Sequence, residues 1–244
     1  MTGRIAVVTG AAGGMGRAIS RKLVQSGLTV VGLDIDADGL AATGDGLGDA
    51  FVARIADLTE ETAVNRAFDD IARDQGGVDA LVNNAGTCFM SDFPDIPADE
   101  FNRQMAINFS SAFYCCQAAI KLMQGRDGVR KIVNISSNGA YNFDVFDPPH
   151  YRASKAAMDT LTKDLARRYA SDRIAVNSIA PAMTETPLFG VLSDDVLQKA
   201  ISAMPHGRAM QADEIAAWVD FLISPAGDIS SGNVIILNQG RDVR

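Results

Sequence analysis

Short apolar runs of strand length alternate along the chain with segments whose apolar residues recur at helical spacing. Continuous apolar runs are typical of strands that are buried on both faces of a parallel sheet. The runs lie at residues 5–8, 29–33, 50–56, 78–82, 131–137, 174–179 and 233–237, and the helical segments at 17–25, 59–75, 99–123, 151–170 and 213–223. The pattern predicts a doubly wound α/β fold of about seven mostly parallel strands flanked by helices.

The alternation continues along the whole chain without a linker. No Pro/Gly/Ser-rich stretch, charge block or repeat marks a boundary. A chain of 244 residues with 47% hydrophobic residues can bury one large core. We therefore expect a single domain over residues 1–244, with a glycine-rich connection at 39–48 and a lid over the substrate at about 184–206.

The first apolar run ends in a glycine-rich turn that opens a helix. Gly10, Gly14 and Gly16 have the spacing Gly-x3-Gly-x-Gly, with Met15 inside it. Glycines let the backbone turn sharply and approach a phosphate closely, and the N-terminus of the following helix offers N–H groups to an anion. The stretch predicts a cradle for a pyrophosphate; the alternative is a tight strand-to-helix turn without a ligand.

Acidic residues close the next two strands, at the edge where an open parallel sheet binds ligands. Asp34 follows the glycine turn by about 20 residues, where a carboxylate can accept hydrogen bonds from an adenosine ribose. Asp57, followed by Leu58, could contact the adenine end of a nucleotide or could cap the next helix. The sequence leaves both roles of Asp57 open.

The fourth apolar run leads into Asn83, Asn84, Ala85 and Gly86. Two amides and a glycine at this edge can tie neighbouring strand ends together and let a ligand lie on bare backbone. The helix that follows carries almost no charge around its circumference from residue 107 to 122. We expect it to be buried by the sheet on one side and by a partner subunit on the other.

A tyrosine and a lysine open the helix predicted at residues 151–170. Tyr151 and Lys155 lie one turn apart and share a face. A nearby ammonium favours phenolate and should lower the pKa of Tyr151 from its ordinary value near 10. This pair predicts a group that transfers protons near neutral pH.

Composition excludes several classes of function. The net charge of −8 argues against a nucleic-acid partner, because such binding depends on Lys and Arg. Cys88, Cys115 and Cys116 have no metal-like spacing, and with two histidines in the chain we expect no metal site. Cys115 and Cys116 should pack as small apolar groups. No signal peptide or membrane-spanning stretch is recognisable, so we expect a cytoplasmic protein in a reducing compartment.

Together, these residues resemble a known family. The motifs occur in the order Thr9-Gly10-x3-Gly14-x-Gly16, Asp57-Leu58, Asn83-Asn84-Ala85-Gly86, Asn108, Ser137 and Tyr151-x3-Lys155. Each motif alone is weak, but the ordered set is specific. The chain is similar over nearly its whole length to the short-chain dehydrogenase/reductase superfamily, and to its single-domain branch with bacterial ketoacyl reductases. The resemblance implies a Rossmann-type fold.

The resemblance also implies catalytic roles. Tyr151 would exchange a proton with the substrate oxygen while a hydride moves between the nicotinamide and carbon. Lys155 would lower the pKa of Tyr151 and hold the nicotinamide ribose, and Asn108 would anchor a water that links Lys155 to solvent. Ser136 and Ser137 compete for hydrogen bonding to the substrate oxygen, and the family's use of the second serine favours Ser137.

Cofactor contacts are implied in the same way. Pro181 and Ala182 correspond to the family's Pro-Gly turn over the nicotinamide, and Asn238-Gln239-Gly240 stands where relatives show Asp-Gly-Gly. The single tryptophan, Trp218, should lie in the core. The expected cofactor-binding residues are Gly10, Gly14, Met15, Gly16, Asp34, Ile35, Asp57, Leu58, Asn84, Ala85, Gly86, Tyr151, Lys155, Pro181, Met183, Thr184 and Thr186.

These features predict an NAD-dependent oxidoreductase that interconverts a secondary alcohol and its ketone, as a homo-oligomer and, by the resemblance, a tetramer. Asp34 favours NAD over NADP, since a 2′-phosphate would place like charges together. An apolar lid without clustered Arg or Lys favours a neutral, hydrophobic small-molecule substrate. The alternatives are an NADPH-dependent ketoacyl reductase and a non-catalytic NAD-binding scaffold or regulator.

Overall fold

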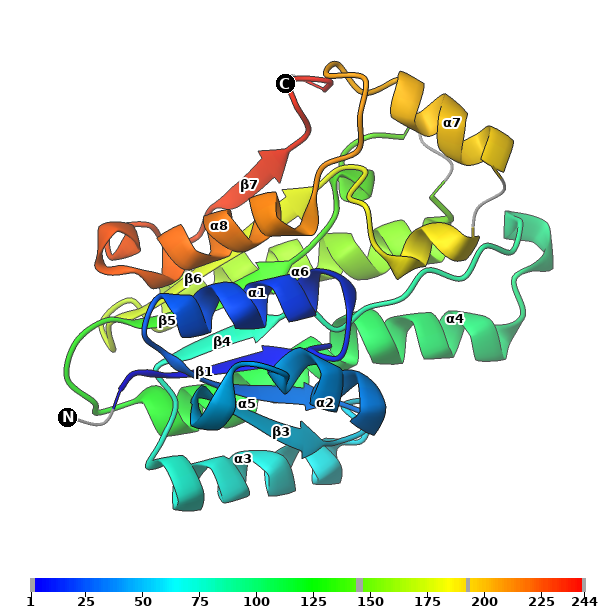
Figure 1. The fold of residues 1–244 in the computed structure, drawn as a ribbon. Helices are drawn as coiled ribbons and strands as arrows, with labels where there is room; N and C mark the ends of the chain where they lie inside the picture. The colour runs from blue at the N-terminus through cyan, green and yellow to red at the C-terminus, as the bar shows by residue number, and fades with distance from the viewer. Residues whose placement is uncertain (1–2, 144–146, 192–193, 243–244) are drawn as a thin grey trace.

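The computed structural model describes residues 3–143, 147–191 and 194–242 of the chain (Figure 1). Its seven strands form one sheet in the order β3-β2-β1-β4-β5-β6-β7, and every neighbouring pair is parallel. The strands are β1 (Ile5–Thr9), β2 (Thr29–Asp34), β3 (Phe51–Ile55), β4 (Ala80–Asn83), β5 (Arg130–Ile135), β6 (Ile174–Pro181) and β7 (Val234–Leu237). The predicted doubly wound sheet is confirmed.

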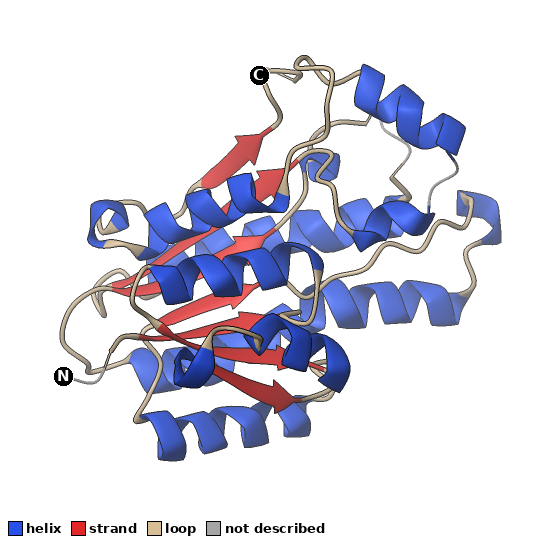
Figure 2. Ribbon diagram, in the orientation of Figure 1, coloured by secondary structure: helices blue, strands red, loops and turns tan. Residues whose placement is uncertain are grey.

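Helices cover both faces of the sheet (Figure 2). One core lies between the sheet and α1 (Gly14–Gln25), α2 (Ala37–Gly44) and α8 (Ala212–Ile223). The other lies between the sheet and α3 (Glu61–Gln75), α5 (Ser111–Met123) and α6 (Pro149–Arg168). Because both faces are buried, the strands need continuous apolar runs, and this explains why those runs dominate the sequence.

The order of strands reverses between β1 and β4, which are neighbours in the sheet. Ligands of open α/β sheets bind outside the carboxyl ends of the strands at such a point. The glycine turn follows β1, and Asn84 follows β4. Helix α7 (Asp194–Ser202) and the short turn Pro187–Val191 lie beyond the same end of the sheet (Figure 1). The expected lid spans this region, although residues 192–193 of it lie outside the described residues.

The connection at residues 39–48 was expected as a glycine-rich loop, and this prediction was wrong for its first half. Helix α2 occupies Ala37–Gly44, and the Asp36 carboxylate caps it by accepting a hydrogen bond from Gly39 N at 3.0 Å. Leu40 is buried beneath it. Capping and burial of one apolar side chain outweigh the low helix propensity of the glycines here.

The helix expected at residues 99–123 is interrupted. It consists of α4 (Ala98–Met105), a π-helical turn at Ala106–Ser110, and α5. Such π turns inside helices frequently mark functional sites. Cys115 and Cys116 are buried in the core as expected, and burial raises the pKa of the Cys116 thiol to about 12.

The expectation that Trp218 lies in the core was wrong. Its side chain on α8 is 42% exposed and meets Phe221, also exposed, edge to face at 6.3 Å between ring centroids. The inner face of α8 is filled instead by aliphatic residues such as Ile215 and Val219. In the described part of the chain, no helix is both long and apolar enough to cross a bilayer.

Candidate active site

The glycine turn after β1 needs glycine for two separate reasons. Gly10 and Gly14 have positive φ angles of +64° and +52°, which favour glycine. A Cβ on Gly10 would also lie 2.9 Å from Ala85 Cα, and a Cβ on Gly16 would collide with Gly10 O. The turn therefore folds tightly against the residues after β4, and its sequence spacing follows from these contacts.

The N-terminus of α1 is free to receive an anion. Its N-cap is Gly13, which offers no capping side chain, and the first turn carries no acidic residue. The first N–H groups of a helix lack partners within the helix and carry its positive dipole end. The residues present therefore fit the pyrophosphate of a dinucleotide.

A hydrogen-bonded clamp joins the ends of β1 and β4. Asn84 Nδ2 donates to Thr9 O at 3.0 Å and to Gly10 O at 3.1 Å. In return, Thr9 Oγ1 accepts hydrogen bonds from the backbone N–H groups of Asn84 and Ala85. These bonds confirm that the amides after β4 tie strand ends together, and they fix the glycine turn in place.

The Asp34 carboxylate is held by backbone donors on both sides. Oδ2 accepts from Ala12 N at 3.0 Å, and Oδ1 accepts from Asp36 N at 3.1 Å. The next residue, Ile35, is exposed. Arg17 donates to Ala12 O and to Thr43 Oγ1. The carboxylate is therefore fixed at the end of β2, where an adenosine ribose would lie.

Two roles were left open for Asp57, contact with the adenine end of a nucleotide and capping of the next helix. Its carboxylate accepts hydrogen bonds from Thr59 N and Thr59 Oγ1, at 3.0 and 2.7 Å. The N-cap of α3 is Glu60, so the capping role of Asp57 was wrong. The Leu58 side chain is buried in the core, which leaves only the backbone of Leu58 for a cofactor contact.

Ser137, Tyr151 and Lys155 meet where β5 ends and α6 begins. Ser137 and Tyr151 line one pocket. Lys155 lies behind it, with Nζ 5.9 Å from the centroid of the Tyr151 ring and donating to Ile135 O at 2.9 Å. Burial lowers the pKa of Lys155 to about 8, although the charge of Asp159 opposes this shift. The structure thus brings together the three side chains expected to transfer the proton.

The expected pKa of Tyr151 is corrected by the structure. Burial raises the pKa of Tyr151 above its ordinary value, and the negative charge of Asp147 adds to the increase. The neighbouring Ser137 hydroxyl acts in the opposite direction. Lys155 was expected to lower this pKa, but its ammonium is itself buried and directed to a backbone carbonyl. Tyr151 is therefore a neutral phenol at neutral pH.

Asn108 sits in the π-helical turn and is fully buried. Its amide donates to Thr87 O at 2.9 Å and to Ser154 Oγ at 3.1 Å, and accepts from Thr87 N at 2.8 Å. A Cβ on Gly86 would lie 3.3 Å from Lys155 Nζ and 3.4 Å from Asn108 Oδ1. Asn108 therefore flanks the same glycine as Lys155, and its side chain is used to hold the backbone.

Ser136 and Ser137, the two candidates for the contact with the substrate oxygen, make different hydrogen bonds, and Ser137 stays the prediction. Ser136 Oγ donates to Asp159 Oδ2 at 2.9 Å, whereas Ser137 Oγ accepts from Gly139 N beside Tyr151. Asp159, which the sequence analysis missed, also accepts hydrogen bonds from Tyr141 and Ser178. Its position four residues after Lys155, on the same helical face, was the available signal.

The turn after β6 and the lid close the pocket over the glycine turn. Met15, Pro181, Met183, Thr184 and Thr186 all line the pocket, as the cofactor prediction requires. A Cβ on Gly14 would lie 3.5 Å from Thr186 Cβ, so the lid passes directly over the turn. Among the described non-glycine residues, positive φ occurs at Arg173 and Gln239 and not at Ala182. Alanine is therefore compatible with this turn.

Four further side chains in the pocket are not among the site residues predicted from the sequence. Cys88 and Met90, from the loop after β4, add to its apolar wall. Asp147 and Arg241 bring a charge of each sign. These residues belong to loops far apart in the chain, and only the folded sheet brings them to one end. In the described residues, no group of three His, Cys, Asp or Glu side chains could hold a metal ion.

Comparisons with known proteins agree with this geometry. A family model described as enoyl-(acyl carrier protein) reductase matches residues 10–242. The 3-oxoacyl-(acyl-carrier-protein) reductase FabG of Vibrio harveyi is 32% identical over 241 residues, which cover 98% of each chain.

Two solved structures from Brucella melitensis have the same fold. A 3-ketoacyl-(acyl-carrier-protein) reductase complexed with NADH superposes with a TM-score of 0.93 at 27% identity, over 99% of each chain. A protein titled short-chain dehydrogenase/reductase SDR:Glucose/ribitol dehydrogenase has a TM-score of 0.92 at 30% identity, over 99% of this chain and 97% of its own. The chain therefore belongs to the short-chain dehydrogenase/reductase superfamily of oxidoreductases and is similar to bacterial 3-ketoacyl reductases.

Proposed function

We propose that the protein transfers a hydride between NAD(H) and a secondary alcohol or its ketone, with Tyr151 as the general acid and base. The observation that carries this proposal is the meeting of Ser137 and Tyr151 in one pocket with Met15 and the lid residues, with Lys155 behind them. This arrangement would allow a substrate carbonyl oxygen and a nicotinamide to lie side by side. Family membership supports the reaction class.

The chain would hold the dinucleotide through the groups described above. The N–H groups at the start of α1 would bind the pyrophosphate, Asp34 would accept hydrogen bonds from the adenosine ribose hydroxyls, and Thr184 and Thr186 would hydrogen-bond the carboxamide. When bound, the nicotinamide supplies or accepts the hydride. Lys155, with a pKa of about 8, would donate to the nicotinamide ribose.

In ketone reduction the phenol of Tyr151 donates its proton to the substrate oxygen as the carbon receives the hydride. The Tyr151 O–H bond breaks, a new O–H bond forms on the substrate, and Ser137 orients that oxygen. The neutral state of Tyr151 at neutral pH suits this direction. Alcohol oxidation runs the same step in reverse and needs the phenolate, so it is favoured at alkaline pH.

The pocket favours a neutral substrate with an apolar part. Met15, Cys88, Met90 and Phe189 form its apolar wall. A panel of secondary alcohols and ketones, assayed with NAD(H) and NADP(H) by absorbance at the nicotinamide band, tests the proposal. We expect turnover with NAD(H); a folded protein that binds NADH but turns over none of the panel would support the scaffold alternative instead.

A second candidate is an NADPH-dependent ketoacyl reductase. It is favoured by relatives named 3-oxoacyl-(acyl-carrier-protein) reductase. Acetoacetyl-CoA, assayed with NADPH and NADH in parallel, separates the two proposals. Higher kcat/KM for the thioester with NADPH than for any simple ketone with NADH would favour the ketoacyl reductase.

A further inference from the structure

The substrate pocket has a polar wall opposite its apolar one, and it contains a carboxylate that the proposed reaction does not use. Asp147 lines this pocket beside Ser137, Gly139 and Tyr151. It is half-buried, and its negative charge adds to the effect of burial in raising the pKa of Tyr151. A charged group this close to the reacting atoms must affect which substrates bind.

The carboxylate lies against the backbone that carries the catalytic serine. A Cβ on Gly139 would collide with Asp147 Oδ2, and it would lie 3.2 Å from Ser137 Oγ. Asp147 and Ser137 therefore flank the same glycine. Because Ser137 marks the position of the reacting oxygen, Asp147 is within reach of a substituent near the reacting carbon.

The Asp147 carboxylate has no donor of its own in the described part of the chain. No hydrogen bond to it and no ion pair with it occurs among these residues. Arg152, which follows on α6, donates to the backbone carbonyls of Asp147 and Gly139 at 2.8 Å. Burial keeps the pKa of Asp147 above its usual range despite Arg152 and Arg241. This half-buried carboxylate, with no donor among the described residues, can accept a hydrogen bond from a donor on the substrate.

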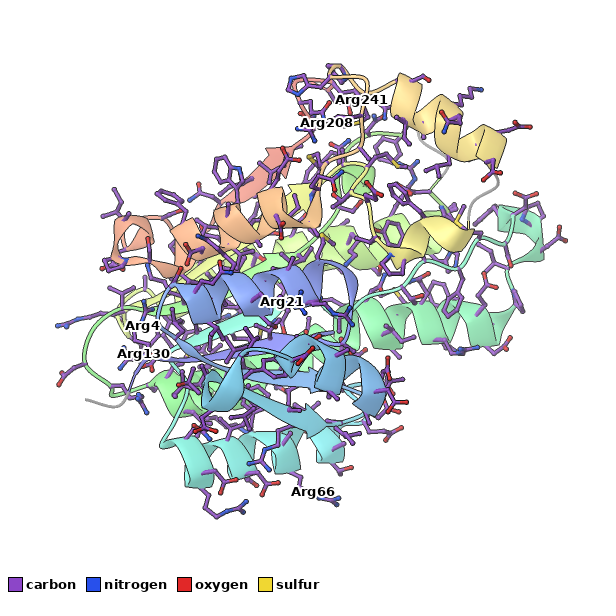
Figure 3. The ribbon with its side chains drawn as sticks, viewed as in Figure 1. Arg4, Arg21, Arg66, Arg130, Arg208 and Arg241 are labelled. Carbon is purple, nitrogen blue, oxygen red and sulfur yellow. The ribbon has the colours of Figure 1, made fainter. Side chains whose placement is uncertain are left out.

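A cation, the guanidinium of Arg241, lines the same pocket, and its Nε lies 3.9 Å from Asp242 Oδ2. Arg241 follows β7 and lies at the end of the molecule occupied by α7, far from Arg4 and Arg130 at the other end (Figure 3). For a substrate carboxylate, attraction by Arg241 is offset by repulsion from Asp147, and for a substrate ammonium the signs are reversed, so neither ion gains a net attraction from the pair. A hydroxyl can both donate to Asp147 and accept from Arg241. The paired charges therefore select a neutral group that donates and accepts hydrogen bonds.

We infer that the substrate carries a second hydroxyl group near the carbon that exchanges the hydride, and that Asp147 accepts its hydrogen bond. This inference rests on the proposed function and narrows it to diols and their hydroxy ketones. The second hydroxyl is unchanged in the reaction; only the C–H and O–H bonds of the other carbinol break. Sites that hydrogen-bond a substrate hydroxyl reject analogues without it, because the protein group is then left unpaired.

The test compares 1-phenylethane-1,2-diol with 1-phenylpropan-1-ol, which has a methyl group in place of the second hydroxyl. We expect the wild type to favour the diol by about tenfold to a hundredfold in kcat/KM, the range for a hydrogen bond to a charged group. Asp147→Leu should bring this ratio to within about threefold of one, and Asp147→Asn, which keeps an acceptor, should retain part of it. The matched control Asp69→Leu removes an exposed carboxylate on α3 and should leave the ratio unchanged.

Calorimetric titration of both alcohols into the same proteins gives a second measurement that needs no turnover. Diol-selective binding that Asp147→Leu abolishes, without turnover, would support the inference and refute the proposed function. Turnover with no preference for the diol would support the proposed function and refute the inference about Asp147. Turnover with a diol preference that survives Asp147→Leu would have the same meaning. Absence of both turnover and binding for the two alcohols would count against both.

Discussion

At the scale of single residues, the proposed chemistry depends on the phenol of Tyr151, which the fold keeps protonated. Burial and the charge of Asp147 both raise the pKa of Tyr151. Behind Tyr151, the charge of Asp159 partly offsets the cost of burying the ammonium of Lys155. The hydroxyls of Ser136, Tyr141 and Ser178 stabilise Asp159 in turn.

Replacing Tyr151 with Phe should lower kcat at least about a hundredfold, the scale expected when a general acid or base is removed. The aromatic ring is retained, so the dissociation constant for NADH should stay within about threefold. Steady-state kinetics and fluorescence titration with NADH measure the two effects. Turnover by the variant comparable to the wild type would remove Tyr151 from the mechanism.

Asp34 should make the protein prefer NAD over NADP by about thirtyfold to a few hundredfold in kcat/KM, because its carboxylate would repel a 2′-phosphate. Two backbone N–H groups hold the carboxylate, so it cannot easily turn away. Asp34→Asn should reduce the preference at least about tenfold, whereas Asp38→Asn, in the neighbouring helix, should not. Equal efficiency of the wild type with both cofactors would contradict the assignment.

Lys155→Met should abolish activity but stabilise the fold at pH 7 by about 1–3 kcal/mol, because it removes a buried charge. The pKa of Lys155 is about 8 in the folded protein, and its ordinary value is 10.5. The lysine is charged in both states below pH 8, so the cost of burial is fully present there. This cost decreases as the pH rises above 8, where the folded protein loses the proton, and it is gone above 10.5.

Urea unfolding at pH 7 and pH 10 measures this gain, which should be smaller at pH 10. Lys163→Met, an exposed position on the same helix, is the matched control and should change stability little at either pH. A loss of stability at pH 7 in Lys155→Met would show that the hydrogen bond to Ile135 O outweighs the cost of the charge.

Individual residues were predictable where a motif fixes both identity and spacing. Gly10, Gly16 and Asn84 contact one another as their order implies, because glycine and amide chemistry leave few alternatives. The pKa of Tyr151 was not predictable, since it depends on burial and on Asp147, which lies in an adjoining loop. Sequence spacing shows that a lysine is near, but not where its ammonium points.

At the scale of elements, the start of α1 lacks a capping side chain that would stabilise the helix, and the same feature suits its proposed role in binding the cofactor. Gly13 is the N-cap, its backbone is extended, and a Cβ there would meet nothing within 4 Å. The site therefore accepts a side chain without strain. Its lack of a capping group leaves the first N–H groups of the helix open to a ligand.

Gly13→Asp should have opposite effects on folding and on binding. An Asp N-cap should stabilise the protein by about 0.5 kcal/mol, and its negative charge should weaken NADH binding at least about tenfold. Gly13→Ala supplies the Cβ without the charge and should change both much less. Thermal unfolding and NADH titration measure the effects; tighter NADH binding by Gly13→Asp would exclude a pyrophosphate at this helix.

The limits of element prediction lie where packing overrides local pattern. Helix α2 forms although its sequence is rich in glycine, because Asp36 caps it and Leu40 is buried. The π-helical turn at Ala106–Ser110 has no signal in apolar spacing, since it inserts into a helix whose ends match the prediction. The strands were predicted well, because burial on both faces requires uninterrupted apolar runs.

At the scale of the whole molecule, large apolar side chains remain exposed on two helical faces. Phe101 and Phe113 are exposed on α4 and α5, and Trp218 and Phe221 on α8. Soluble monomers rarely leave such clusters in water. The sequence pattern predicted that the helix now divided into α4 and α5 has an apolar outer face, but it did not predict the exposed aromatic residues of α8. The apolar spacing of α8 does not show which of its sides meets the sheet.

We expect a homo-oligomer, and by family resemblance a tetramer, with α4, α5 and α6 at one interface. Phe113→Arg should lower the mass measured by light scattering at micromolar concentration, because a charge would be buried in the contact. Phe93→Arg, at an exposed position in the loop before α4, should not. A monomeric wild type would refute the expectation.

Because β1 lies between β2 and β4 in the sheet, the glycine turn after β1 reaches its final contacts only after the chain beyond β4 has been synthesised. The first three strands can pair as they emerge, but the glycine turn is fixed only when Asn84 reaches Thr9 and Gly10. From that point the nucleotide cradle exists, while β6, β7 and the lid are still to come. Long-range pairing of this kind folds slowly. A nucleotide that binds the part of the chain from β1 to Asn84 would stabilise that part by mass action. The cofactor would then aid folding before the substrate pocket has formed.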